Sequence, residues 1–238
     1  MKQLRYFFLM VMTCTFTLVQ AQNKIPAQTQ RYVPQSIDLG LPSGTLWADR
    51  NMRENEAATN FGQYYSWGSV VADDEALSYE QYNQRMMASW KGYKHGTGAK
   101  ALTKYCTDSA FGKKDGKTQL DPEDDAAAVY AKTHKVPIWD AQWHMPTADQ
   151  FAELIEKCKW TWEKSGYRVT GPNGKSIFLP TAGFAGNNEK DVGYYWTSTL
   201  CEDFPCYAYA VMFGDGFIGW NNGTRYKGYS IRPVKSKK

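Results

Sequence analysis

Short apolar segments, each ended by glycine, proline, asparagine or aspartate, follow one another through most of this chain. Apolar runs of about four to eight residues between turn-forming residues are typical of β-strands, whereas a helix shows a longer run with a helical period. The pattern therefore predicts a domain built from short strands and many turns. The segments are, in chain order, IDLGLPSGTLWA, FGQYYSWG, YRVTGPNGKSIFLP, GYYWTSTL, YAYAVMF, GFIGW and YSIRPV.

One hairpin can be placed from its turn sequence. Residues 167–170 and 176–179 flank the sequence GPNG at 171–174. Glycine at both ends of the turn, with proline and asparagine between, favours a tight reversal of the chain. We expect the two flanking segments to pair as antiparallel strands.

A first helix is predicted at residues 121–134, which read DPEDDAAAVYAKTH. Asp121 is suited to cap the helix, Pro122 to occupy its first position, and the acids at 123–125 to interact favourably with its positive end. Capping thus accounts for the acidic cluster. A calcium site is the alternative, because carboxylates are ligands of this ion, although the spacing matches no known calcium-binding loop.

A second helix is predicted near residues 147–158. Thr147 is suited to cap it, and Phe151, Leu154, Ile155 and Cys158 recur at helical spacing, so that they would bury one face. Between residues 78 and 116 the pattern is weak and glycine-rich, and we expect irregular structure there.

The N-terminus has the three parts of a secretory signal peptide. Lys2 and Arg5 form a basic start, residues 6–19 are apolar, and the small residues Val19 and Ala21 stand at the positions of a cleavage site. We therefore expect residues 1–21 to be a signal peptide and the protein to be exported. Lipid attachment at Cys14 is the alternative, although the residue before this cysteine and the apolar residues after it do not fit a lipoprotein signal.

The remaining chain divides into a linker and one domain. Residues 22–35 are rich in glutamine and poor in large apolar groups, so we expect a flexible linker. Residues 36–238 suit a single domain with a substantial core. The apolar run of the signal has about 14 residues, fewer than the roughly 20 that a membrane-spanning helix needs, and no later run is as apolar. We expect no transmembrane segment.

The charge balance argues against a nucleic-acid partner. The formal net charge is +4, but the tail lysines at 235, 237 and 238 and the two basic residues of the signal lie outside the body of the domain. The body is therefore near neutral, and it carries no basic stripe of the kind that binds phosphate backbones.

Four cysteines lie beyond the predicted signal, and export exposes them to oxidising surroundings. Four cysteines allow three disulfide patterns. Our first expectation pairs Cys201 with Cys206, because these bracket a short turn, and Cys106 with Cys158.

Eight segments in order resemble the Fibrobacter succinogenes major paralogous domain family. They are IDLGLPSGTLWA, FGQYYSWG, LTKYCT, LDPEDDAA, WHMPTADQFAELI, VTGPNGKSIFLP, GYYWTSTL and GYSIRPV, and they span residues 36–234. His144 stands where the family motif has arginine. The resemblance implies an α+β, C-type-lectin-like fold with small mixed or antiparallel sheets, two helices, long irregular loops and neighbouring chain ends. It also implies a protein of a Gram-negative, gut Bacteroidetes-type bacterium, located in the periplasm, on the outer surface or in the medium.

The resemblance also directs attention to residues 212–229. Retroelement-diversified variable receptors share the implied fold, and their ligand contacts lie just before a terminal strand similar to residues 230–234. Aromatic rings with amide and guanidinium groups can bind sugar rings or protein surfaces, as in adhesion. The alternative is that these residues only cover the domain's own surface. The candidate ligand contacts are Met212, Asp215, Phe217, Trp220, Asn221, Asn222, Arg225, Tyr226 and Tyr229.

An enzymatic function is the rival from another class. Formylglycine-generating enzymes share the implied fold and hold copper with two cysteines at the separation of Cys201 and Cys206, and two thiolates suit Cu(I). The Gly-Gly-Ser sequence that precedes those cysteines is absent here, and a disulfide explains the pair without a metal. We therefore expect a non-enzymatic protein with no cofactor. A third alternative is a structural or accessory surface protein without a ligand of its own.

Other potentially reactive residues form no recognisable pattern. His95, His134 and His144 lack zinc-ligand spacing, and no hydrolase or phosphate-loop motif occurs. The acid pairs at 73–74 and 202–203 are typical of solvated loops, but their spacing in three dimensions is needed to judge a glycosidase.

Several residues are expected to be structural. Arg232 lies in an apolar terminal segment, and we expect it to pair with a buried acid. Most tryptophans lie inside apolar segments and are expected in the core, where a large ring contributes a few kcal/mol of burial energy. They are Trp47, Trp67, Trp139, Trp143, Trp160, Trp162 and Trp196.

Overall fold

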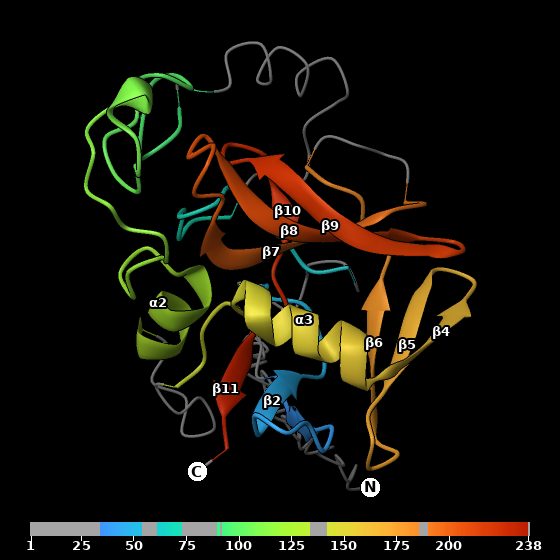
Figure 1. Ribbon diagram of the computed structural model, residues 1–238. Coiled ribbons are helices and arrows are strands. Elements are labelled where there is room, and N and C mark those ends of the chain that lie inside the picture. The colour runs from blue at the N-terminus through green and yellow to red at the C-terminus, as the bar shows by residue number, and fades with distance from the viewer. Residues whose placement is uncertain are drawn as a thin grey trace, which may run out of the picture.

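The protein has an α+β architecture, seen here in a computed structural model (Figure 1). The structure describes residues 34–53, 61–72, 90, 92–133, 142–185 and 190–237. The predicted signal peptide and residues 22–33 of the predicted linker lie outside this part. Among the described residues, no helix is long and apolar enough to cross a membrane.

Within the described residues, the fold combines two α-helices and one short 3-10 helix with three small sheets, which confirms the α+β class. The helices are α2 (Ala126–Thr133), α3 (Ala148–Lys157) and the 3-10 turn η1 (Ser109–Phe111). The strands are β1 (Ser36–Asp38), β2 (Thr45–Ala48), β3 (Tyr64–Tyr65), β4 (Lys159–Glu163), β5 (Gly166–Thr170), β6 (Ser176–Pro180), β7 (Gly193–Leu200), β8 (Tyr207–Gly214), β9 (Phe217–Thr224), β10 (Tyr229–Ser230) and β11 (Val234–Ser236).

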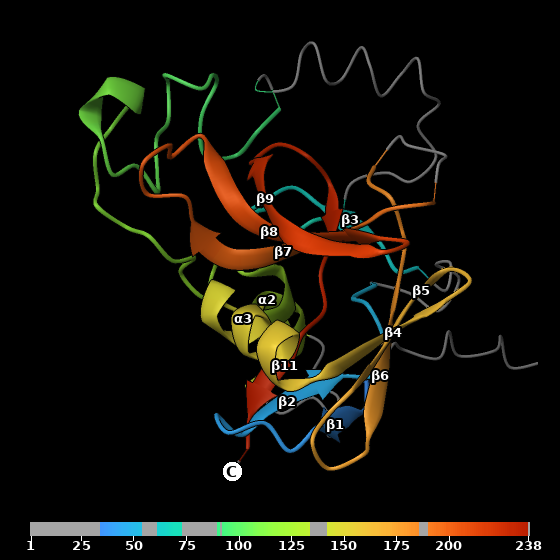
Figure 2. The ribbon, with the colours of Figure 1, turned by 45° about the vertical axis from the view of Figure 1, so that its right-hand side comes forward.

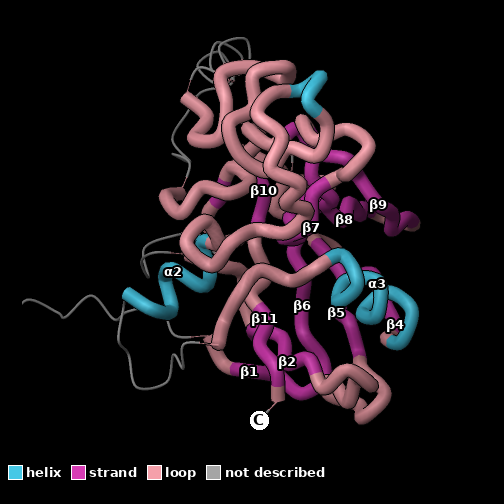
Figure 3. The backbone as a smooth tube through the Cα atoms, turned by 60° about the vertical axis from the view of Figure 1, so that its left-hand side comes forward, coloured by secondary structure: helices cyan, strands magenta, loops and turns pink. Residues whose placement is uncertain are grey.

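The largest sheet has five strands in the order β3-β10-β7-β8-β9 (Figure 2). The pair of β10 and β7 is parallel and the other pairs are antiparallel, so the sheet is mixed. Strand β9 lies at its edge. Loops on either side of η1 account for much of the chain on one flank (Figure 3). They agree with the irregular structure expected for residues 78–116, of which 78–89 and 91 lie outside the described residues.

Two three-stranded sheets lie at the other end of the molecule (Figure 2). In one, β1 and β11 both pair with β2, so the first and last described strands lie in the same sheet, as expected. In the other, β5 and β6 form the predicted hairpin around residues 171–174. Strand β4 completes this sheet and was not predicted, although its alternating sequence KWTWE is typical of a strand.

Helix α3 confirms its prediction closely. The Thr147 hydroxyl accepts a hydrogen bond from the Gln150 N–H, and the Gln150 side chain accepts one from the Thr147 N–H, which together form a capping box. Phe151 and Leu154 are fully buried. The helix packs against β7 and β8 and thereby supports the five-stranded sheet from one face (Figures 1 and 2).

Helix α2 begins four residues later than predicted, at Ala126 rather than Pro122, so the predicted cap at Asp121 is wrong. Asp125 takes the capping role: one oxygen accepts a hydrogen bond from the Ala128 N–H at 3.0 Å, and the other accepts one from the Met145 N–H at 2.8 Å. Residues 121–124 instead form a turn, because their carboxylates are engaged by lysines described below.

The five-stranded sheet separates two aromatic cores. Neighbouring residues of one strand point to opposite faces, and Tyr195 belongs to one core while Trp196 belongs to the other. Most of the tryptophan predictions are confirmed: Trp47, Trp67, Trp143 and Trp196 are buried, and Trp160 and Trp162 are partly buried. Trp139 lies outside the described residues.

Candidate ligand-binding surface

Strands β8 and β9 form a long antiparallel hairpin at the edge of the five-stranded sheet (Figure 1). Gly216 in its turn has a φ of 79°, a left-handed conformation that glycine adopts without strain. We call residues 201–224 the β8–β9 ribbon, since a tight turn at residues 201–206 leads directly into β8. Most of the predicted ligand contacts lie on it.

The exposed aromatic rings of the ribbon point to opposite faces. Trp220 pairs with Val211 and Asn222 with Tyr209, and residues paired across antiparallel strands share a face. Phe217 lies three residues before Trp220 and therefore on the other face, where its ring lies over Gly214. Trp220 is 45% exposed and Phe217 41% exposed.

The nine candidate contacts differ sharply in exposure. Met212, Asn221 and Tyr226 are half-buried, and Tyr226 also meets the ring of Trp90 edge-on at 5.2 Å. Arg225 and Tyr229 are buried. The exposed candidates are Asp215, Phe217, Trp220 and Asn222.

Arg225 is an internal anchor, so its prediction as a ligand contact is wrong. Its side chain is fully buried and donates hydrogen bonds to the carbonyls of Lys104, Tyr105 and Pro205 and to the Tyr93 hydroxyl, at 2.9–3.0 Å. The guanidinium also lies over the ring of Trp67 at 4.9 Å. Arg225 therefore ties the end of β9 to the loops at residues 93–105 and 205.

Tyr229 is also internal, and its prediction as a ligand contact is wrong for the same reason. Its ring stacks on Tyr194 at 4.9 Å and lies 4.3 Å from the ring of Trp196. Burial raises its pKa, and its hydroxyl accepts a hydrogen bond from the Asn221 amide. A Cβ on Gly223 would lie 2.5 Å from Trp196 and 2.6 Å from Tyr229, so glycine allows β9 to pass directly over these rings.

The exposed charges of the ribbon all have one sign. Glu202, Asp203 and Asp215 are exposed acids, and residues 201–224 contain no lysine, arginine or histidine. This surface differs from the chain as a whole, which is net positive. It favours neutral or basic ligands and disfavours polyanions.

The four described cysteines are free thiols in the structure. The Cys106 thiol donates a hydrogen bond to the Asp108 carbonyl in a loop near η1. Cys158 ends helix α3 and packs against the core that contains Phe151 and Leu154. The fold therefore does not bring this predicted pair together. Cys201 and Cys206 bracket their turn as expected, and both are buried. A disulfide between these two stays a prediction for oxidising surroundings.

The chemistry of the Cys201 and Cys206 pair gives little support to a copper site. Burial raises the pKa of Cys206, which favours the neutral thiol over the thiolate that binds Cu(I).

The acidic cluster near α2 binds an ammonium group. Asp121, Glu123 and Asp124 are close enough to share a metal ion, but the Lys104 Nζ lies between them, 2.6 Å from Asp121 and 2.7 Å from Asp124. Lys94 contacts the other oxygen of Asp124 at 2.5 Å. These lysines take the place that a calcium ion would need, so the residues do not fit the calcium alternative.

Asp124 and His95 should make the protein sensitive to acid. Burial alone would raise the pKa of Asp124, but hydrogen bonds from Lys104, Lys94 and Tyr105 outweigh it and lower this pKa well below 3.8. Burial lowers the pKa of His95 below 6.5, opposed by Asp124. In both cases the unfolded state binds more protons than the folded state, so the free energy of unfolding falls as the pH falls.

We therefore expect urea midpoints to decrease from pH 6.5 downward because of His95, and more steeply below pH 4 because of Asp124. The measurement is urea unfolding between pH 7.5 and 3. His95→Gln should remove the first decrease and keep the second. An unchanged first decrease in this variant would assign it to another group.

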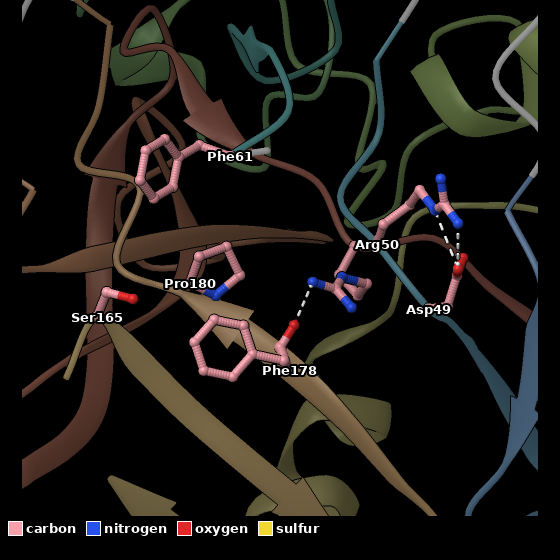
Figure 4. Close-up of a pocket in the computed structure, with 7 residues that line it drawn as sticks. Asp49, Arg50, Phe61, Ser165, Phe178 and Pro180 are labelled. Carbon is pink, nitrogen blue, oxygen red and sulfur yellow. Dashed lines mark hydrogen bonds and ion pairs between the residues drawn. The ribbon is translucent and has the colours of Figure 1, made fainter. Parts of the chain in front are cut away.

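Two shallow cavities lie away from the ribbon. One of about 350 Å³ is lined by α2, residues 142–147 and Ser198, where Asp125 serves as the helix cap. The other, of about 340 Å³, is bounded by Phe61, Phe178 and Pro180 and by the ion pair of Arg50 with Asp49 (Figure 4).

Arg232 lies at this second cavity and donates to neutral oxygens in its described hydrogen bonds. They are the Asn51 amide oxygen at 2.8 Å and the carbonyls of Ala48 at 3.0 Å and Phe178 at 2.7 Å. The acid expected as its partner is not among them. The side chain is 1% exposed, in keeping with a structural role.

Comparison with known proteins gives no match: no family model, no curated protein and no solved structure matches the chain. The family resemblance and the C-type-lectin-like assignment therefore stay predictions.

Proposed function

We propose that this protein is an exported, non-enzymatic ligand-binding protein that works outside the cytoplasm and contacts a glycan or protein through the β8–β9 ribbon. The observation that carries the proposal is the combination of exposed and buried residues on one short segment. Trp220, Phe217 and Asn222 present rings and an amide to solvent, while Arg225 and Tyr229 fix the same strand and its continuation to the core.

Rigid anchoring favours binding because less conformational entropy is lost when a ligand docks. Large aromatic side chains on a fixed strand add contact area at a small further entropy cost. The described part of the protein shows no comparable gathering of exposed aromatic rings elsewhere: Val71 and Phe204 are its other large exposed hydrophobics, and Phe204 belongs to the ribbon itself.

The C-type-lectin-like fold and the extracytoplasmic location belong to the same proposal. The sheet that joins the first and last described strands, the two described α-helices and the long loops support the fold assignment. The sequence of residues 1–21 supports export.

The test is an array of glycans and extracellular proteins, probed with the labelled chain lacking residues 1–21. The proposal expects at least one hit that is lost in the double variant Phe217→Ala/Trp220→Ala and kept in Val71→Ala, which removes an exposed apolar side chain elsewhere. Hits unaffected by the double variant would place binding outside the ribbon. No hit would favour an accessory surface protein without its own ligand.

A further inference from the structure

One face of the β8–β9 ribbon combines three groups that we call the Trp220 corner: Trp220, Tyr209 and Asn222. The Trp220 and Tyr209 rings meet edge-on, with centroids 6.2 Å apart and an angle of 75°. Asn222 is the strand partner of Tyr209, so its exposed amide lies beside the two rings on the same face. The arrangement is a small right-angled platform with a planar polar group at its side.

The charged residues of the ribbon that carries this platform are all acids. The Cys201 thiol, partial burial, and the nearby acids Asp203 and Glu202 raise the pKa of Tyr209, so its phenol stays protonated near neutral pH. The Asn222 amide supplies both a donor and an acceptor. A ligand that suits this corner therefore brings many hydroxyl donors and no negative charge.

The apolar surface of the ribbon is too divided to form the core of a protein interface. Trp220 and Phe217 lie on opposite faces of β9, and the 55% exposed Phe204 lies in the turn before β8, at the far end of the hairpin from Phe217. Stable protein interfaces have a contiguous apolar core within roughly 1,000 Å² or more of buried area. A single ring beside polar groups instead matches the size of one sugar residue.

We propose that the Trp220 corner binds one pyranose ring of a neutral glycan, without a metal ion. The C–H face of the sugar stacks on Trp220, with the Tyr209 edge as a side wall, and its hydroxyls bond to the exposed amide of Asn222. This inference rests on the proposed function, because it names the ligand class of the same ribbon.

Affinity gel electrophoresis tests it with defined probes: mannan, laminarin, xyloglucan and pectic galactan as neutral polysaccharides, and chondroitin sulfate as an anionic one. We expect retardation by at least one neutral polysaccharide, unchanged by EDTA, and none by chondroitin sulfate. Trp220→Ala should weaken binding about tenfold or more, as expected for a central aromatic contact. Trp220→Phe should restore part of it, and Val71→Ala, which removes an exposed apolar side chain outside the ribbon, should bind normally.

The outcomes separate this inference from the proposed function. Neutral-glycan binding that is lost in Phe217→Ala but kept in Trp220→Ala overturns the corner and leaves the ribbon as the binding surface. Binding only to extracellular proteins, reduced by Trp220→Ala, overturns the glycan class and also leaves the ribbon. Binding abolished by EDTA overturns the metal-free mechanism. Absence of glycan and protein binding, or binding unaffected by every ribbon variant, overturns both proposals.

Discussion

Replacing Arg225 with alanine is expected to destabilise the protein by about 4 kcal/mol, a large part of the roughly 5–15 kcal/mol by which a domain is stable. The substitution removes donors from three buried acceptors, the carbonyls of Tyr105 and Pro205 and the Tyr93 hydroxyl, and from the part-buried Lys104 carbonyl. A buried acceptor without a partner costs about 1–3 kcal/mol. The cavity left among the aromatic rings adds to that cost. Urea unfolding followed by tryptophan fluorescence measures the change.

Two further variants make the Arg225 result interpretable. Arg225→Lys keeps the charge but cannot reach four acceptors with one ammonium group, so it should recover only part of the stability. Arg168→Ala removes an exposed arginine paired with Glu163 and should cost about 1 kcal/mol or less. A fully stable Arg225→Ala variant that no longer binds ligand would return Arg225 to the binding surface.

Arg232→Ala is expected to cost about 3 kcal/mol without a selective loss of ligand binding. Arg232 joins β2, β6 and the segment before β11 through its bonds to Ala48, Phe178 and Asn51, and all three acceptors lie at or near the buried core. Its loss should therefore loosen the sheet that contains the first and last described strands. The measurement pairs a thermal melt with binding to the array hit at a temperature where the variant is folded.

Arg50→Ala provides the matched control for Arg232. Arg50 borders the same cavity but is half exposed and paired with Asp49, so its removal should change the melting temperature little. Equal losses of melting temperature in the two variants would contradict a special stabilising role of the buried Arg232 guanidinium. A folded Arg232→Ala protein that fails to bind the array hit would contradict a purely structural role and point to the cavity.

Local signals in the sequence predict the local structure well. The capping box of α3 and the turn at 171–174 depend on residues a few positions apart, and both are found as expected. The start of α2 is different, because Lys104 lies about 17 residues before Asp121 in the chain and draws the predicted cap into an ion-pair cluster. A contact of this kind is not visible in a helix pattern.

The candidate site shows the same difference between local sequence signals, which can be read in advance, and contacts between distant segments, which cannot. The alternation of β9 and its polar and aromatic content predict exposed groups such as Trp220 and Asn222, which the structure places on the surface. Arg225 and Tyr229 belong to the same stretch but are buried, because their partners come from distant segments around residues 93–105 and 194–196. Tyr209 is half-buried and joins the site through its strand pairing with Asn222.

Hydroxyl-radical footprinting of the chain, with and without the ligand found on the array, tests most directly whether the β8–β9 ribbon is the binding surface. Radicals label exposed aromatic and sulfur side chains, so Trp220 reports one face of β9 and Phe217 the other. We predict strong protection of Trp220 by the ligand and unchanged labelling of the half-buried Trp162 in β4, outside the ribbon. Protection confined to residues outside 201–224, with Trp220 labelled as in the free protein, would contradict binding at the ribbon.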